Sequence, residues 1–236
     1  MLQAGLHAIE SGIICTKNGN DSKALFLLHG EGADASTTFT DSSQYARAFT
    51  PTGNAQIDTA QFKFGASSML FDGSGDYLTC ADSADFNLGT GDFTLDFWIR
   101  PNSPGTCRVF TFGRDETSPG GCFQIALVTS TTMRFEIRND AGSAQASGNT
   151  TLTNGAWSHL ALVRSGNTFT LYVNGVSSLT LTDSGSYSAQ ADGFTFGARR
   201  LASSFDQAFT GWFDEIRFST MARWTADFTP PTKAYG

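Results

Sequence analysis

The feature that most constrains the fold is the strict alternation of apolar and other side chains in residues 93–100 (FTLDFWIR). In an extended strand, every second side chain lies on the same face, whereas a helix would spread these residues around its axis. The residues that share one face are Phe93, Leu95, Phe97 and Ile99. The segment therefore predicts a β-strand with one face in a hydrophobic core and the other toward solvent or a second layer.

Similar short runs recur along the chain, separated by clusters of Gly, Ser, Thr, Asn and Asp. The pair Asn174 and Gly175 is a strong hairpin signal, because both residues tolerate positive φ. Residues 221–224 fit one helical turn, and no long helical period is present. The further predicted strands are 24–29, 68–71, 77–80, 122–128, 133–137, 157–164, 168–173, 176–182, 194–196 and 212–218. The fold class predicted is all-β, a two-sheet antiparallel jelly-roll sandwich.

The first 23 residues have mixed polarity and no clean period, unlike the chain that follows. We interpret residues 1–23 as an N-terminal arm that is disordered alone or ordered against a partner. No linker interrupts the rest, and sandwiches of this size commonly form a single unit. The predicted domains are therefore an arm over 1–23 and one jelly-roll domain over 24–236.

The charge balance excludes some partners. The chain has 22 acidic and 15 basic residues, for a net charge of −7. Nucleic-acid affinity comes chiefly from neutralised phosphates, so we expect no nucleic-acid partner. No apolar run is long enough for a transmembrane helix, so we expect no membrane insertion. The N-terminus lacks the positive start and apolar stretch of a secretory signal, and classical export is not expected.

The four cysteines, Cys15, Cys80, Cys107 and Cys122, contain no C-x-x-C pair, which argues against zinc-ribbon and thioredoxin-like sites. Buried reduced thiols are one interpretation. Cys107 and Cys122 flank a Gly- and Pro-rich stretch, so a disulfide between them across a hairpin is the other.

Five segments carry a family resemblance when they are taken in order. They are 71–78 (FDGSGDYL), 91–101 (GDFTLDFWIRP), 157–164 (WSHLALVR), 171–175 (LYVNG) and 209–217 (FTGWFDEIR). The chain resembles the laminin-G-like group of the concanavalin A-like lectin/glucanase superfamily. The resemblance implies a two-sheet jelly roll, in agreement with the alternation.

The opening of the predicted domain carries a narrower resemblance. Residues 27–34 (LLHGEGAD) and 37–43 (TTFTDSS) are similar to the start of laminin-G-like domains in structural proteins of tailed phages. Those domains usually have an aromatic residue and an aspartate where this chain has Gly30 and Glu31. This resemblance implies that the protein lies on the virion surface and has capsid or tail proteins as partners. It also implies a homo-oligomer, with a trimer favoured.

Catalysis is not expected. Glucanases of the superfamily need two carboxylates at close spacing, often within a Glu-x-Asp-x-x-Glu strand, and this motif is absent. Glu136 has Arg134 and Arg138 on its own face, which is typical of a solvated charge row. A glycoside hydrolase acting through Glu136 or Glu215 is the remote alternative.

We expect a structural calcium ion because one carboxylate lies on an otherwise apolar strand face. Asp214 lies in phase with Trp212, Ile216 and Phe218 on a face that is otherwise apolar, so its carboxylate needs a partner. Members of the resembled group often hold one calcium near this segment. The resemblance implies that Asp214 binds calcium together with Asp34 or Asp41, whose oxygens are suitable ligands.

Carbohydrate contact is expected at two places. Trp98 and Tyr172 lie opposite the apolar stripes of their strands, where they either stack on sugars or pack against a second layer. Asp72 and Asp76 beside Tyr77 form a rim loop, or simply a hairpin turn. No sugar specificity follows from these residues.

The leading hypothesis is a non-enzymatic surface protein of a tailed-phage virion that decorates the capsid or belongs to the tail or fibres, with contact to host glycans. The alternative is a freestanding extracellular lectin or adhesin that binds carbohydrate with calcium. Copurification with capsid or tail proteins separates the two.

Overall fold

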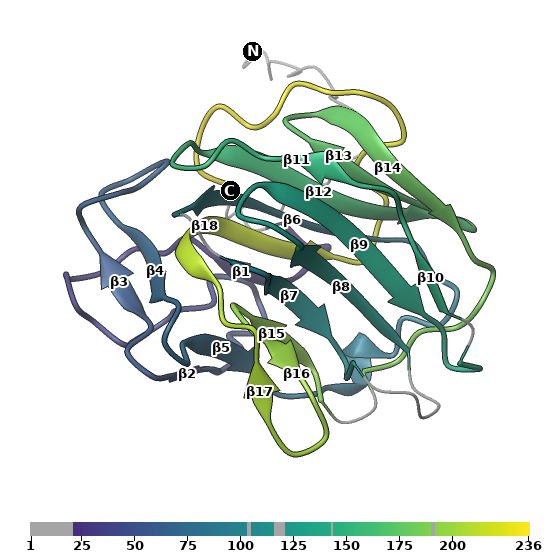
Figure 1. Ribbon diagram of the computed structural model, residues 1–236, viewed down its shortest axis with the longest axis horizontal. Helices are drawn as coiled ribbons and strands as arrows, with labels where there is room; N and C mark the ends of the chain where they lie inside the picture. Colours follow the sequence, from purple (N-terminus) through teal and green to yellow (C-terminus); the bar gives the residue numbers. More distant parts are fainter. Residues whose placement is uncertain (1–20, 103–104, 116–120, 143, 190–191) are drawn as a thin grey trace, which may run out of the picture.

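The computed structural model describes residues 21–102, 105–115, 121–142, 144–189 and 192–236. Two antiparallel sheets face each other as a sandwich (Figure 1). The predicted arm lies outside the described residues, except for its last three positions. Among these, Asp21 is buried against the domain.

The first sheet has the order β14-β13-β12-β6-β18-β4-β3, and β1 pairs with β18 beside this path. Its strands are β1 (Ala24–Leu28), β3 (Gln56–Asp58), β4 (Ser68–Asp72), β6 (Phe93–Pro101), β12 (Ser158–Ser165), β13 (Thr168–Val173), β14 (Val176–Thr182) and β18 (Thr210–Ser219). Strand β18 is central, because it pairs with β1, β4 and β6.

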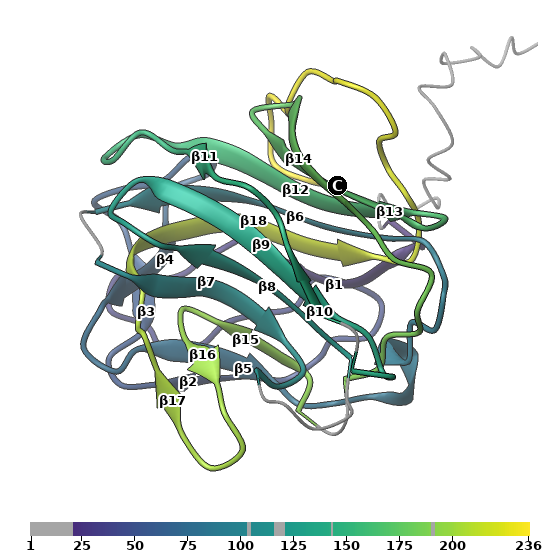
Figure 2. The same cartoon turned by 45° about the vertical axis from the view of Figure 1, so that its right-hand side comes forward.

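The second sheet has the order β10-β9-β8-β7-β15-β5-β2, with β11 paired to β9. Its strands are β2 (Phe49–Thr52), β5 (Tyr77–Cys80), β7 (Cys107–Phe112), β8 (Cys122–Leu127), β9 (Thr132–Arg138), β10 (Ala144–Ala146), β11 (Thr150–Thr151) and β15 (Phe194–Phe196). A small hairpin, β16 (Arg199–Arg200) with β17 (Phe205–Asp206), projects from the sandwich (Figure 2). One short 3-10 helix, η1, spans Ala84–Phe86.

The all-β, two-sheet antiparallel prediction is confirmed, but the helical turn predicted at 221–224 is wrong. Residues 222–224 have no regular secondary structure. The Thr94 hydroxyl donates to the Met221 carbonyl at 2.7 Å and accepts the Arg223 amide at 3.0 Å. A side chain of β6 therefore takes the backbone groups that a helical turn would pair internally.

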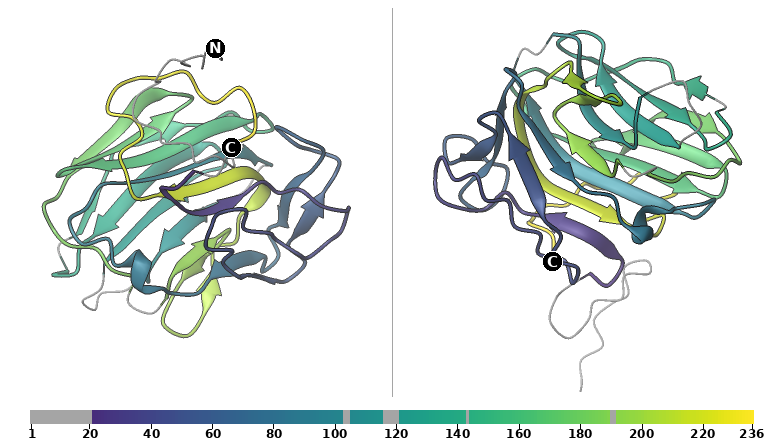
Figure 3. Two further views of the ribbon diagram at one scale, coloured as in Figure 1. Left: turned by 180° about the vertical axis from the view of Figure 1, so that it is seen from behind. Right: turned by 90° about the horizontal axis from the view of Figure 1, so that it is seen from below.

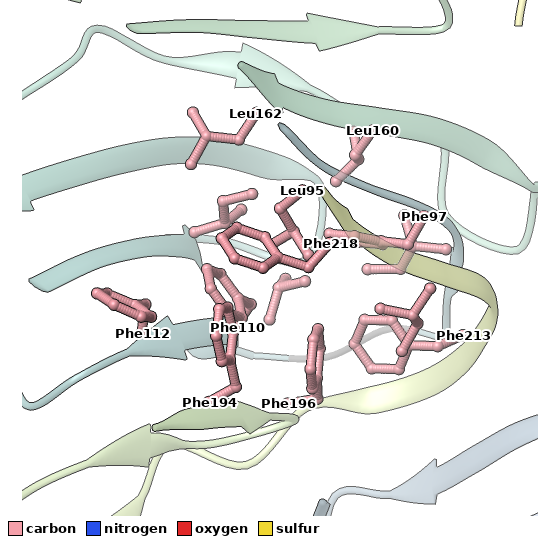
Figure 4. Close-up of a cluster of buried hydrophobic side chains, with 14 of the residues drawn as sticks. Leu95, Phe97, Phe110, Phe112, Leu160, Leu162, Phe194, Phe196, Phe213 and Phe218 are labelled. Carbon is pink, nitrogen blue, oxygen red and sulfur yellow. The ribbon is translucent and has the colours of Figure 1, made fainter. Parts of the chain in front are cut away.

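The core lies between the sheets and is dominated by phenylalanine, as Figure 4 shows. The predicted inner face of β6 is fully buried. Rings from the two sheets meet directly, with Phe194 of β15 and Phe218 of β18 at a centroid distance of 4.8 Å. Phe26 of β1 touches rings from both sheets, including Phe194 at 5.0 Å and Phe218 at 5.6 Å. Aromatic packing therefore joins the two layers.

The hairpin predicted at Asn174 and Gly175 is confirmed. Both residues have positive φ, 51° and 80°, as this two-residue turn requires. A side-chain carbon at Gly175 would lie 1.9 Å from the Phe228 carbonyl oxygen. The Phe228 amide also donates to the Gly175 carbonyl at 2.8 Å. The glycine thus permits both the turn and close approach of a distant part of the chain.

A β-bulge in β18 corrects the expected orientation of Asp214. The pairing with β6 shifts register between Asp214 and Arg217, and Glu215 has a φ of 52°. The extra residue changes the phase of the strand, so Ile216 and Phe218 enter the core while Asp214 does not. Asp214 lies opposite Trp98 of β6, outside the core.

The register of β7 and β8 excludes the Cys107–Cys122 disulfide. Cys107 lies opposite Leu127, whereas Cys122 is at the other end of the hairpin, ~17 Å along the strand. Both are buried free thiols, as is Cys80, and Cys15 lies outside the described residues. No helix in the described part of the chain is long and apolar enough to span a membrane.

We expect Phe26→Ala to lower the free energy of unfolding by about 3–5 kcal/mol, because it leaves a cavity where rings of both sheets meet. The matched control is Phe62→Ala, because Phe62 is 44% exposed. The control should change stability by less than about 0.5 kcal/mol. Urea unfolding of both variants tests this, and equal effects would contradict the assigned core.

Candidate functional site

Residues 220–236, which we call the C-terminal segment, lie on the outer side of the first sheet. Figures 2 and 3 show this segment in yellow, running beside β12, β13 and β14. Trp224 stacks on Phe228 with a centroid distance of 3.9 Å, and Phe228 contacts Tyr172 of β13 at 5.4 Å. Together with Ala161 and Val163 of β12, these rings form a second, smaller apolar cluster.

Buried charges attach the C-terminal segment to the sheet. Asp96 of β6 accepts two hydrogen bonds from Arg217 of β18, at 3.1 and 2.8 Å. Burial alone would raise the pKa of Asp96, but the guanidinium of Arg217 and the imidazole of His159 together outweigh burial and hold this pKa below its usual value. Arg217 lies over the Tyr235 ring at 3.9 Å, and the Tyr235 hydroxyl contacts His159 Nε2 at 3.0 Å.

A hollow of about 240 Å³ opens beside the C-terminal segment. We call it the Trp224 hollow. It is lined by Val163, Ser165, Thr168, Thr170, Tyr172, Trp224 and Thr225. Its wall contains two aromatic rings and several hydroxyl groups, and none of these side chains is charged at neutral pH. The structure thus places the predicted Tyr172 in a hollow, although this side chain is only 3% exposed.

Trp98, the other aromatic residue predicted to stack on sugar, is covered. The ammonium of Lys63 lies 4.0 Å from the centre of its ring, Phe64 packs edge-on against it at 5.8 Å, and Trp98 is 6% exposed. Trp98 therefore packs against a second layer of side chains, which is one of the two interpretations of its sequence position. Its ring face is not available to a ligand.

The predicted rim loop is formed where β4 connects to β5. The carboxylate of Asp76 is buried and accepts the Asn54 and Asp72 amides at 2.8 Å each, so this side chain fixes the turn. Asp72 is exposed, and Tyr77 stacks on Phe205 at 4.0 Å. The structure brings these predicted residues together, but Tyr77 belongs to the second sheet while Tyr172 belongs to the first.

The three carboxylates predicted to bind calcium are not brought together. Asp34 accepts from the Thr59 amide, Asp41 from the Leu27 amide and Asp214 from the Lys63 amide, so each carboxylate is hydrogen-bonded to a different backbone group. Calcium takes six to eight oxygen ligands. Within the described ranges, no group of three or more His, Cys, Asp or Glu could hold a metal ion. Among the described residues the three carboxylates form no such group, and the structural calcium ion stays a prediction.

The bulge in β18 instead creates a polar cluster that the sequence did not reveal. Oδ2 of Asp214 accepts the Lys63 and Phe64 amides at 2.7 and 3.1 Å, while its buried Oδ1 has no hydrogen-bond partner. Burial raises the pKa of Asp214 to about 7, against the effect of these two amides. Beside it, Glu215 contacts His29 Nδ1 at 2.9 Å, and this hydrogen bond raises the pKa of His29.

A second hollow, of about 280 Å³, lies on the outer face of the second sheet. We call it the Arg138 hollow. It is lined by Asp115, Cys122, Gln124, Glu136, Ile137, Arg138, Gln145 and Ala146. Unlike the Trp224 hollow, it is rich in charged side chains. Burial raises the pKa of the Cys122 thiol to about 12, so this hollow contains no ready thiolate nucleophile.

The carboxylates of the Arg138 hollow are held by cations. Arg134 Nη2 contacts Glu136 Oε1 at 2.6 Å, and Gln124 donates to Oε2 at 2.7 Å. Arg108 Nη2 lies 3.6 Å from Glu136 and 3.5 Å from Asp115. Both oxygens of Glu136 are therefore engaged by side chains of the protein itself, which is typical of a structural carboxylate.

The family comparison agrees with this architecture. Residues 72–227, more than half of the chain, match the model of the Laminin_G_3 family, described as the concanavalin A-like lectin/glucanases superfamily. The chain belongs to this superfamily. No curated protein sequence matches it.

Solved structures show the same fold in clostridial toxins. The botulinum neurotoxin serotype D binding domain matches with a TM-score of 0.63 and 11% identity over 85% of this chain and 49% of that chain. The binding domain of Paraclostridial Mosquitocidal Protein 1 matches with a TM-score of 0.65 and 15% identity over 85% and 49%. A structure of botulinum neurotoxin type C, a toxin whose cell entry depends on interaction with two ganglioside molecules, also matches. Its TM-score is 0.63, with 16% identity over 87% of this chain and 50% of that chain. The chain spans about half the length of these neighbours.

The polar cluster predicts a stability that falls as pH rises. The pKa of Asp214 is raised to about 7 in the folded state, so between about pH 4 and pH 7 the unfolded chain releases this proton more readily and the folded state loses stability. Asp214→Asn should therefore be more stable than the parent at pH 8, by up to roughly 4 kcal/mol, and similar to it near pH 4.

Urea unfolding at several pH values measures this difference. His29, whose pKa is also raised, contributes stability that is lost as pH rises through its folded-state pKa, so some decline remains in the variant. Asp34→Asn, at an exposed carboxylate, is the matched control. A parent and an Asp214→Asn variant with the same pH profile would refute the assignment.

Proposed function

We propose that this chain is a non-enzymatic glycan-binding domain that takes a neutral sugar in the Trp224 hollow. The observation that carries the proposal is the composition of this hollow, which combines the half-buried ring of Trp224 with several side-chain hydroxyl groups and no ionised side chain. A sugar ring presents C–H groups on its faces and hydroxyl groups on its edge. Aromatic rings and side-chain hydroxyls complement these two surfaces.

The size of the hollow supports a small ligand. At about 240 Å³ it lies below the roughly 300–1,000 Å³ of sites for drug-sized molecules. We expect one terminal sugar to enter, with modest affinity. The bulge and the buried Asp96–Arg217 pair hold the surrounding strands and the C-terminal segment in place, so the hollow is largely preformed.

The arrangement of carboxylates supports binding without catalysis. Glu136 lies in the second sheet with both oxygens hydrogen-bonded, and Glu215 lies in the first sheet, paired with His29. These two residues, which the hydrolase alternative requires, therefore belong to different faces of the sandwich. The botulinum neurotoxin D neighbour is a binding domain, and the cell entry of botulinum neurotoxin type C depends on interaction with two ganglioside molecules. These neighbours support glycan binding in this fold.

For the setting, we propose the surface of a tailed-phage virion, with capsid or tail proteins as partners and a homo-oligomer, a trimer being favoured. The similarity of residues 27–43 to phage laminin-G-like domains supports this setting, and the interpretation of residues 1–23 as a docking arm agrees with it. A freestanding extracellular lectin is the second candidate. Imaging or copurification of the native assembly distinguishes them, because only the first predicts association with capsid or tail proteins.

The binding proposal predicts that Trp224→Ala weakens binding of neutral oligosaccharides about tenfold or more, because an aromatic contact at the centre of a hollow is lost. Thr168→Val removes a hydroxyl from the same wall with little change in shape and should also weaken binding. Trp212→Ala, at a half-buried tryptophan of β18 outside the hollow, is the matched control.

A glycan panel followed by calorimetric titration measures these effects, with circular dichroism to confirm folding. Binding that survives Trp224→Ala unchanged, or a panel without any bound glycan, would count against the proposal. Thr168→Val keeps the test informative if the alanine variant fails to fold.

A further inference from the structure

Arg138 is the last residue of β9 and lies between two neighbouring strands. It pairs with Cys122 of β8 on one side and with Ala144 of β10 on the other. Its side chain lines the Arg138 hollow, on the sheet opposite to the Trp224 hollow. The function proposed above does not use this residue.

The other guanidinium groups around this hollow have carboxylate partners. Arg108 lies between Asp115 and Glu136, Arg134 pairs with Glu136 at 2.6 Å, and Arg199 pairs with Asp206 at 2.5 Å. These contacts fix the positions of the charges on the face of the second sheet. They also occupy the carboxylates that would otherwise neutralise Arg138.

Arg138 differs from its neighbours. Among the described residues it has no ion pair and no side-chain hydrogen bond, and its Nε, like that of Arg134, is buried without a partner. A buried donor that has lost water and gained no acceptor is unfavourable, and an acceptor from a ligand would relieve this cost. The planar guanidinium has two parallel N–H groups that match one carboxylate.

The carboxylates of the hollow define the rest of the ligand. Asp115 and Glu136 line the same space and only accept hydrogen bonds, so they favour hydroxyl donors and repel an ion with several negative charges. The net charge of −7 also disfavours polyanions. The suitable ligand therefore carries one negative group beside several hydroxyl groups.

We propose that the Arg138 hollow binds an acidic sugar of the uronic-acid class, with its carboxylate on Arg138 and its hydroxyl groups on Asp115 and Glu136. This inference rests on the proposed glycan-binding function for its class of ligand, but it uses a separate surface. The volume of about 280 Å³ suits a single sugar residue.

The test is titration of the full chain with glucuronic and galacturonic acid oligosaccharides and with their neutral glucose and galactose counterparts. The parent should bind the acidic oligosaccharides at least about tenfold more tightly in this hollow, and Arg138→Gln should abolish that preference. The preference should also weaken with added sodium chloride. Arg100→Gln, at an arginine of β6 in the other sheet, is the matched control.

Two further measurements separate the possible outcomes. Trp224→Ala should remove neutral-sugar binding but keep the acidic preference, whereas Arg138→Gln should do the reverse, so the two proposals fail independently. Inorganic sulfate and phosphate should compete only weakly. Competition by these ions as strong as that of the uronic acids, or equal binding of acidic and neutral oligosaccharides, would overturn the acidic-sugar site.

Discussion

Asp96 and Arg217 face each other across β6 and β18, where water has little access. A buried charge is tolerated only when it is paired and hydrogen-bonded, so each residue requires the other. Arg217 also lies beside Asp21 and over the Tyr235 ring, and the same network reaches His159. These contacts hold the C-terminal segment against the first sheet. The Trp224 hollow exists because this segment is held there.

The outer face of the second sheet differs from that of the first. No segment comparable to residues 220–236 is seen over β7, β8 and β9 in the described structure (Figures 1 and 3), and charged side chains occupy this face instead. Arg108 contacts Asp115 and Glu136, Arg134 also contacts Glu136 and Arg199 also lies near Asp115, so neither carboxylate is isolated from positive charge. The two faces therefore offer different chemistry, one neutral and aromatic, the other ionic.

The alternation in residues 93–100 and the pair Asn174–Gly175 were sufficient to predict inner faces and a turn, because both signals are local. The bulge at Glu215 was not predictable from a period of two, since one extra residue reverses the phase without changing composition. Tyr172 and Trp98 were correctly placed outside the main core. Their covering by Phe228 and Lys63 depends on contacts between distant segments, which the sequence pattern does not show.

The phenylalanine core explains why such different faces can coexist on one sandwich. Phe194 and Phe218 meet between the sheets, so the packing that joins the two layers depends on inner side chains, and exposed outer side chains can vary with little effect on it. Each hollow is small enough that it would hold about one sugar residue, and the two open on opposite sheets, so one short glycan would not reach both. Tight attachment to a glycan-coated surface then requires several copies side by side. The oligomer proposed for the virion surface would supply this multivalency without any new contact in the domain.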